Sequence, residues 1–138
     1  MVSKNDKQEK KDQDLSVLIV EDNDVSREVL RLALRDKHQI YAAKGEKEAW
    51  TLYKSKKPDV VFVDIRLSDG DGLHLTRRIK EDNPETYVVV MTVNDFEEEK
   101  EKAAQNFADS FIAKPFTQAE VEACLERCWT FKVHGAWV

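Results

Sequence analysis

The sequence contains a short apolar run that ends in a carboxylate and then enters a loop rich in Gly and Asp. The run is Val60–Val63, Asp64 follows it, and the loop covers residues 65–72. A strand that is apolar on both faces is typical of the centre of a parallel sheet covered by helices on each side. Because such a strand cannot bury a carboxylate in its middle, Asp64 is predicted at its C-terminal end, the edge where open α/β sheets bind ligands.

Apolar, strand-like segments alternate with helical patterns along the rest of the chain. The predicted strands are residues 15–20, 39–43, 60–64, 87–91 and 110–113. The predicted helices are residues 25–37, 46–56, 72–80, 96–105 and 117–129. Five strand–helix units predict an α/β fold, a (βα)5 doubly wound parallel sheet with right-handed crossovers. The flavodoxin-like strand order 2-1-3-4-5 is the leading choice for this number of units.

The helix ends carry local signals. Asp24 is predicted to cap the first helix, and Asn106 to close the fourth in the left-handed conformation. Thr117 and Glu120 have the T-x-x-E spacing of a capping box at the start of the last helix. One face of the first helix is apolar and consists of Val25, Val29, Leu32 and Ala33.

Residues 15–129 are expected to form one domain, because 138 residues are enough for one sizeable core. Residues 1–14 are polar and highly charged, so they are expected to be a disordered tail. Residues 130–138 form an extension too apolar for a free tail, which is expected to fold back on the domain or to meet a partner.

Charge and hydropathy exclude several classes of partner. With 22 Lys and Arg against 27 Asp and Glu, the net charge of −5 argues against direct nucleic-acid binding by this segment. No apolar run approaches the ~20 residues that span a bilayer, and no signal peptide opens the chain. No membrane association and a cytoplasmic location are therefore expected. Cys124 and Cys128 are expected to be reduced thiols on a helix; with His134 they would give one ligand fewer than a closed zinc site needs.

Polar side chains occur at the C-terminal ends of four predicted strands. Glu21 and Asp22 follow the first strand, Asp64 ends the third, Thr92 follows the fourth and Lys114 follows the fifth. In the order 2-1-3-4-5 these four strands are neighbours. Each residue alone is more simply a cap or turn residue. Together they predict that three carboxylates, a hydroxyl and an ammonium converge on one site.

The chemistry of these groups points to phosphoryl transfer. Crowded carboxylates resist ionisation unless a cation lies among them, and an oxygen-only ligand set suits Mg²⁺. Lys114 and Thr92 are suited to bind the oxygens of a phosphoryl group, and Mg²⁺ neutralises its charge. Asp64, central and nearest to both sets, is the predicted nucleophile and would form an aspartyl phosphate.

From residue 15 to residue 129, the sequence resembles the receiver domain of bacterial two-component response regulators. The resemblance is carried by the acidic pair at 21–22, the V-V-F-V-D strand with its D-G-D-G-L loop, Thr92, the Lys114–Pro115 pair and Phe111 three residues before the lysine. These dispersed motifs occur in the order and spacing of that family.

The resemblance implies that Asp64 accepts a phosphoryl group from a phosphohistidine on a sensor histidine kinase or a histidine phosphotransfer protein, with Mg²⁺ required. It implies that the main-chain carbonyl of Arg66 joins Glu21, Asp22 and Asp64 as a metal ligand. Thr92 and Phe111 would act as the switch that repacks the face of the fourth helix, fifth strand and fifth helix. Many family members then form homodimers. The Lys114–Pro115 bond is expected to be cis.

Several positions depart from the commonest family pattern. Ser68 stands where many receivers have Pro, which is expected to loosen the loop after Asp64. Val93 follows Thr92 where a small residue is usual, and Arg66 and Asn94 flank the path of an attacking water. We expect slow loss of the phosphoryl group because Val93 and Arg66 crowd that path.

Two alternatives compete with a phosphoacceptor that is not a turnover enzyme. A Mg²⁺-dependent phosphohydrolase with an aspartyl nucleophile requires a second carboxylate, two residues after the nucleophile, as general acid. This chain has Arg66 at that position. A receiver-like interaction module that works without phosphorylation would be expected to lack the acceptor or the lysine, and both are present.

Overall fold

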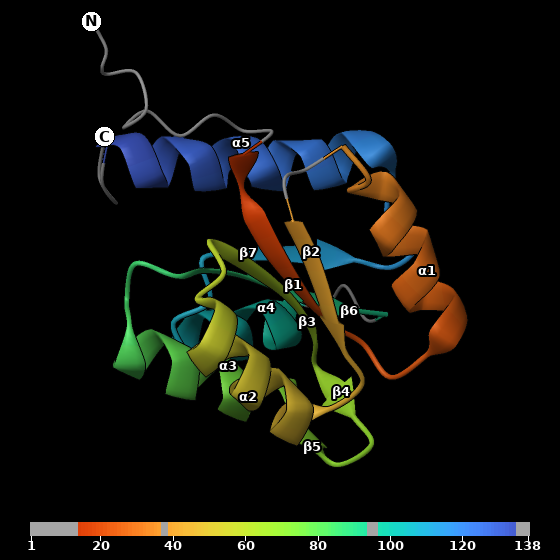
Figure 1. Ribbon diagram of the computed structural model, residues 1–138. Coiled ribbons are helices and arrows are strands. Elements are labelled where there is room, and N and C mark those ends of the chain that lie inside the picture. The colour runs from red at the N-terminus through yellow and green to blue at the C-terminus, as the bar shows by residue number, and fades with distance from the viewer. Residues whose placement is uncertain (1–13, 37–38, 94–96, 135–138) are drawn as a thin grey trace, which may run out of the picture.

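A central parallel sheet organises the chain in the computed structural model, which describes residues 14–36, 39–93 and 97–134 (Figure 1). Its strands are β1 Ser16–Val20, β2 Gln39–Ala43, β3 Val60–Asp64, β6 Tyr87–Thr92 and β7 Ser110–Ala113. The order is β2-β1-β3-β6-β7, which is 2-1-3-4-5 for the five main strands. All four neighbouring pairs are parallel. The predicted fold class and strand order are confirmed.

Helices cover both faces of the sheet. They are α1 Asp24–Ala33, α2 Glu46–Lys56, α3 Gly72–Asp82, α4 Glu97–Gln105 and α5 Gln118–His134. Figure 1 shows α1 and α5 on one side and α2, α3 and α4 on the other. No helix in the described ranges combines the length and apolar character that crossing a membrane requires.

Each face of the sheet has its own hydrophobic core. Phe62 points to the α1–α5 side and packs in a buried cluster with Leu30 and Leu125. Its neighbours Val61 and Val63 point to the other side, where they join a second cluster formed by residues of the neighbouring strands and of helices α2, α3 and α4. This alternation explains why the strand is apolar at every position before Asp64, since both of its faces are covered.

A two-stranded hairpin that the sequence did not predict follows β3. It consists of β4 Arg66–Leu67 and β5 Gly70–Asp71, paired antiparallel. Asp71 also caps α3, because its side chain accepts a hydrogen bond from the backbone N–H of Leu73. The Gly- and Asp-rich loop is therefore a structured link between the Asp64 strand and the next helix.

The first helix ends at Ala33, earlier than the predicted residue 37, and it differs from its prediction in two further ways. Asn23, not Asp24, is its N-cap, and accepts a hydrogen bond from the N–H of Ser26 at 2.8 Å. Most of the predicted apolar face is turned to solvent, with Val25 71%, Val29 50% and Leu32 52% exposed, whereas Ala33 and Leu30 pack in the core. The helix has apolar residues on two sides, and periodicity cannot decide which side meets the sheet.

Two helix ends also differ. The left-handed residue after α4 is Phe107, with a φ of 70°, and not Asn106. The N–H of Asn106 still donates to the carbonyls of Lys102 and Ala103 in the helix. Helix α5 continues to His134 instead of ending at about Trp129. The ring of Phe131 packs edge-on against Tyr87 with centroids 5.5 Å apart, which gives these later turns a contact with the sheet.

Other local predictions are confirmed by the structure. Thr117 and Glu120 form the reciprocal capping box, with N···O distances of 2.8 and 3.1 Å. Cys124 and Cys128 are free, buried thiols. Several predictions fall on residues that the structure does not describe. They concern residues 1–13 of the predicted tail 1–14, Asn94, the side chain of His134 and the last four residues of the extension.

Candidate functional site

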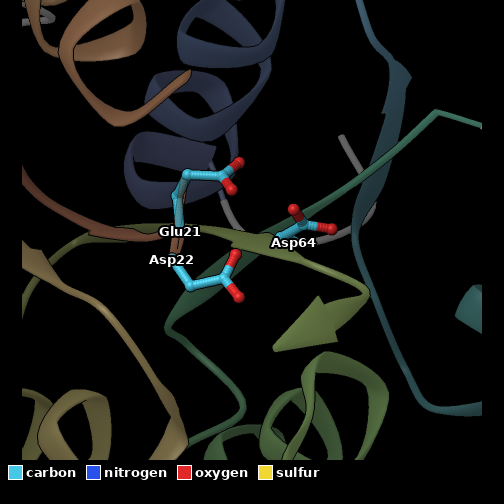
Figure 2. A group of neighbouring side chains, drawn as sticks. All are labelled: Glu21, Asp22 and Asp64. Atoms are coloured by element: carbon cyan, nitrogen blue, oxygen red, sulfur yellow. The ribbon is translucent and has the colours of Figure 1, made fainter. Parts of the chain in front are cut away.

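Three carboxylates meet at the C-terminal edge of the sheet. Glu21 and Asp22 follow β1, and Asp64 ends the neighbouring β3 (Figure 2). Glu21 is only 2% exposed, and its Oε2 accepts a hydrogen bond from the N–H of Asn23 at 3.1 Å. The strand order thus brings together acids that are 42 to 43 residues apart in sequence, as the strand-end positions predicted.

The donor set fits a hard divalent cation. Glu21, Asp22 and Asp64 each offer one carboxylate oxygen, and these oxygens lie within 4.8 Å of one another. Oxygen ligands without His or Cys favour Mg²⁺ over the metals that thiolates and imidazoles select. Arg66 lines the same hollow, and its N–H donates to Asp64 Oδ1 at 3.1 Å.

Lys114 reaches this group from β7, two strands away from Asp64. Its Nζ lies 2.8 Å from Asp64 Oδ2 and 2.5 Å from Glu21 Oε1. The Lys114–Pro115 peptide bond is cis, as expected. The ammonium therefore already bridges two of the three carboxylates and partly offsets their mutual repulsion.

Burial and this ion pair set the electrostatics of the site. Burial raises the pKa of Glu21, and the hydrogen bond from Lys114 opposes that rise. Burial alone would lower the pKa of Lys114, but its hydrogen bonds to Asp64 and Glu21 outweigh that effect and raise it. Lys114 is therefore held in its charged form, the form that can bind phosphoryl oxygens.

Thr92 and Phe111 lie on the adjacent strands β6 and β7. Thr92 ends β6, is 5% exposed, and lines the hollow beside Asp64 and Lys114. Phe111 is half-buried and packs against the core cluster on the α2–α3–α4 side. In the strand register Phe111 pairs with Val90, and Thr92 pairs with Ala113, two positions further along the same two strands.

The hollow has a volume of about 620 Å³ and an apolar rim that the sequence did not reveal. Val25 and Val29 reach it from α1, Val93 from the end of β6, and Phe116 from the segment after Lys114. The apolar stripe on α1 was visible in the sequence, but its position beside the acidic site follows from the way α1 packs on the sheet.

Comparison with known proteins decides the family. The sequence pattern described as the response regulator receiver domain matches residues 17–126. The chain belongs to the response regulator receiver domain family. The fold is thus that of a receiver domain of two-component systems, and the acidic cluster at the sheet edge is consistent with the site of such a domain.

Individual relatives agree with this assignment. The receiver domain is 35% identical over 113 residues to the virulence transcriptional regulatory protein PhoP of Salmonella typhimurium, covering 81% of this chain and 50% of PhoP. The solved receiver domain of NtrX from Brucella abortus is 30% identical, with a TM-score of 0.77, covering 82% of this chain and 97% of that one. The chemotaxis protein CheY4 of Vibrio cholerae, 20% identical with a TM-score of 0.78 over 83% of this chain and 98% of its own, shares the fold.

The chain spans about half the length of the curated relatives that it matches. The shared half is the receiver domain. The activity of the other half belongs to those relatives and is not assigned to this chain.

Proposed function

We propose that this receiver domain is a phosphoacceptor switch that takes a phosphoryl group onto Asp64 from a phosphohistidine of a sensor histidine kinase or a histidine phosphotransfer protein in the cytoplasm. The observation that carries the proposal is the contact of Lys114 Nζ with Asp64 Oδ2 at 2.8 Å, beside the oxygens of Glu21 and Asp22. It joins a nucleophilic carboxylate, a cation for the phosphoryl oxygens and a metal ligand set in one site.

In this mechanism an oxygen of Asp64 forms a bond to phosphorus while the bond from phosphorus to the imidazole nitrogen breaks. The electron pair of that broken bond returns to the imidazole of the donor. Lys114 binds one phosphoryl oxygen, and the hydroxyl of Thr92 donates to another. Glu21, Asp22, Asp64 and the Arg66 carbonyl would hold Mg²⁺, which when bound neutralises charge on the transferring group.

Beryllofluoride, which mimics an acyl phosphate, provides the direct test. With Mg²⁺ present, the wild-type chain is expected to form a stoichiometric adduct, and Asp64→Asn is expected to form none. Acetyl phosphate should likewise add one phosphoryl group per chain, measurable by intact mass. Steady release of phosphate in many turnovers would instead indicate a phosphohydrolase, and absence of any adduct in the wild type would reject the switch.

The apolar rim supports a protein as the phosphoryl donor. Val25 and Val29 are exposed beside an acidic hollow, a combination that suits contact with a folded partner more than capture of a small anion. We expect Val29→Asp to slow transfer from a cognate phosphotransfer protein at least tenfold, about 1.4 kcal/mol, while leaving reaction with acetyl phosphate unchanged. Val133→Asp, at an equally exposed valine near the end of α5, is the matched control.

The output of the switch is proposed to be the face of α4, β7 and α5. Phosphoryl binding would draw Thr92 towards the site and open space for the half-buried ring of Phe111, which has no hydroxyl to desolvate. Homodimer formation through that face is the expected consequence. Gel filtration with and without beryllofluoride tests it, and an unchanged elution volume for a chain that carries the adduct would contradict it.

A further inference from the structure

The hairpin of β4 and β5 is fastened to helix α2, a helix that takes no part in the site described above. Arg66 pairs with Asp71 and Leu67 with Gly70, so residues 68 and 69 form the turn of the hairpin. Figure 1 shows this hairpin beside the start of α2. This contact bears on the phosphoacceptor site because the backbone N–H of Arg66, which belongs to the hairpin, donates a hydrogen bond to the Asp64 carboxylate.

Asp69 caps α2 from outside that helix. The N-cap position of α2 is Gly45, which has no side chain to bond the first free N–H groups. The Asp69 carboxylate accepts hydrogen bonds from two of these N–H groups instead, from that of Glu46 at 2.7 Å and from that of Lys47 at 3.3 Å. These backbone donors lower the pKa of Asp69, and a carboxylate is also favoured at a helix N-terminus.

The side chain of Glu46, at the start of α2, makes a second contact with the hairpin, at β5. Its Oε1 accepts a hydrogen bond from the N–H of Asp71 at 3.3 Å, and its Oε2 lies 2.7 Å from Nδ1 of His74 on α3. In an ordinary capping box the two reciprocal bonds lie within one helix end. Here the Asp69 carboxylate accepts from the N–H of Glu46, and the Glu46 carboxylate accepts from the N–H of Asp71, so the two bonds run between separate elements and tie the hairpin to α2.

The two glycines at the contact allow this close approach. A Cβ atom added at Gly45 would overlap the Asp69 carboxylate, and one added at Gly70 would overlap the carboxylate of Glu46. A glycine before α2 therefore faces the Asp69 carboxylate of the hairpin, and a glycine of the hairpin faces the Glu46 carboxylate of α2. The fit is mutual, so a change on either side is expected to loosen the whole contact.

We propose that Asp69 and Glu46 form a clamp that fixes the hairpin and thereby positions the Arg66 carbonyl for Mg²⁺. Asp69 is a positioning residue, because it touches neither the metal ligand set nor the expected phosphoryl position. The inference rests on the proposed function, in which Arg66 contributes a metal ligand. Outer contacts that orient a ligand commonly change metal affinity by 10–100-fold when removed.

Mg²⁺ affinity measured by calorimetric titration tests the clamp. Asp69→Ala is expected to raise the Kd for Mg²⁺ about tenfold, with the rate of phosphorylation by acetyl phosphate largely restored at saturating Mg²⁺. Asp69→Asn keeps an acceptor oxygen for the α2 N–H groups but loses the charge. The clamp predicts a Kd near the wild-type value for this variant, whereas an effect of charge alone would raise it as much as alanine does.

Glu48→Ala is the matched control. It removes a carboxylate from the same first turn of α2, but Glu48 bonds to the N–H of Lys44 and not to the hairpin. Its Kd is expected to be unchanged. Gly70→Ala reaches the clamp from the opposite side by displacing the Glu46 carboxylate, and should weaken Mg²⁺ binding even if Asp69→Ala proves too unstable to study.

The outcomes separate the clamp from the proposed function. A wild-type Kd in folded Asp69→Ala and Gly70→Ala, with only a lower melting temperature, would overturn the clamp and leave the phosphoacceptor role intact. Equal weakening in Asp69→Asn and Asp69→Ala would also overturn it. If the wild-type chain itself binds no Mg²⁺, the proposed function is rejected and the clamp with it.

Discussion

At the scale of single residues, the site partly offsets its negative charges before any phosphoryl group arrives. Lys114 contacts both Glu21 and Asp64, and all three side chains are at least 85% removed from solvent. Removing solvent strengthens such contacts and makes an unpaired charge costly. Chemistry at this edge therefore depends on a few atoms at fixed positions, and neighbouring side chains control access to them.

The lifetime of the phosphoryl group is expected to depend on two such neighbours. Arg66 and Val93 are exposed and line the hollow beside Asp64, where we expect them to crowd the path of an attacking water. We expect the Arg66→Asn, Val93→Ala double variant to lose the phosphoryl group about tenfold faster than wild type, about 1.4 kcal/mol in barrier height. Decay of the phosphorylated form after removal of acetyl phosphate measures this rate.

Val133→Ala, which removes the same atoms from an exposed valine on α5, is the control for this comparison. A wild-type lifetime no longer than that of the double variant would show that these side chains do not shield the acyl phosphate.

At the scale of secondary-structure elements, polar clamps join segments that the cores alone do not fix. One is the exchange between Asp69 and Glu46. Another is Lys80 near the end of α3, which is 8% exposed and donates to the carbonyls of Pro84 and Thr86 at 2.8 Å. The same Nζ lies 2.7 Å from Asp109 Oδ2, before β7. Lys80 therefore connects α3 to the starts of β6 and β7.

Loss of the Lys80 ammonium is expected to destabilise the domain strongly. Lys80→Met keeps most of the aliphatic packing but leaves a half-buried carboxylate and two carbonyls without this donor. We expect the free energy of unfolding to drop by about 3 kcal/mol, the usual cost of removing one partner of a buried pair. Urea unfolding measures it, with the exposed Lys56→Met as the control. A loss equal to that of Lys56→Met would contradict the role of the clamp.

At the scale of the whole molecule, the strand order delivers groups from four strands to one edge. The cluster of acids there favours any state in which a cation lies among them. The folded chain forms this ligand set and the unfolded chain does not, so binding of Mg²⁺ at this set would be coupled to folding.

Mg²⁺ is accordingly expected to stabilise the domain. At 100 times its Kd, Mg²⁺ should add about 2.7 kcal/mol to the free energy of unfolding. Thermal or urea unfolding with and without Mg²⁺ checks this, with NaCl at matched ionic strength as the control for simple screening. The gain should be largely lost in Asp22→Asn, and an equal gain with NaCl would argue against a specific site.

Much of the fold could be predicted from the order of residues, because strand and helix signals are local. The runs at β3 and β6 are apolar on both faces, and the Thr117–Glu120 spacing alone identified the start of α5. Alternation of strand and helix then restricted the topology to a few parallel arrangements. The residues that converge at the site followed from that topology, because strand ends of a parallel sheet share an edge.

Other features required the folded molecule because they depend on contacts between distant segments. Helix α1 is apolar on two sides, and only packing selected Leu30 for the core and left Val25 and Val29 beside the site. In the sequence Asp69 is one of several acids in a loop, and its bonds to α2 exist only once the β4–β5 hairpin and α2 lie side by side. The sequence by itself determined which groups reach the sheet edge, since strand periodicity is local, whereas the rim and the clamp arose from tertiary packing.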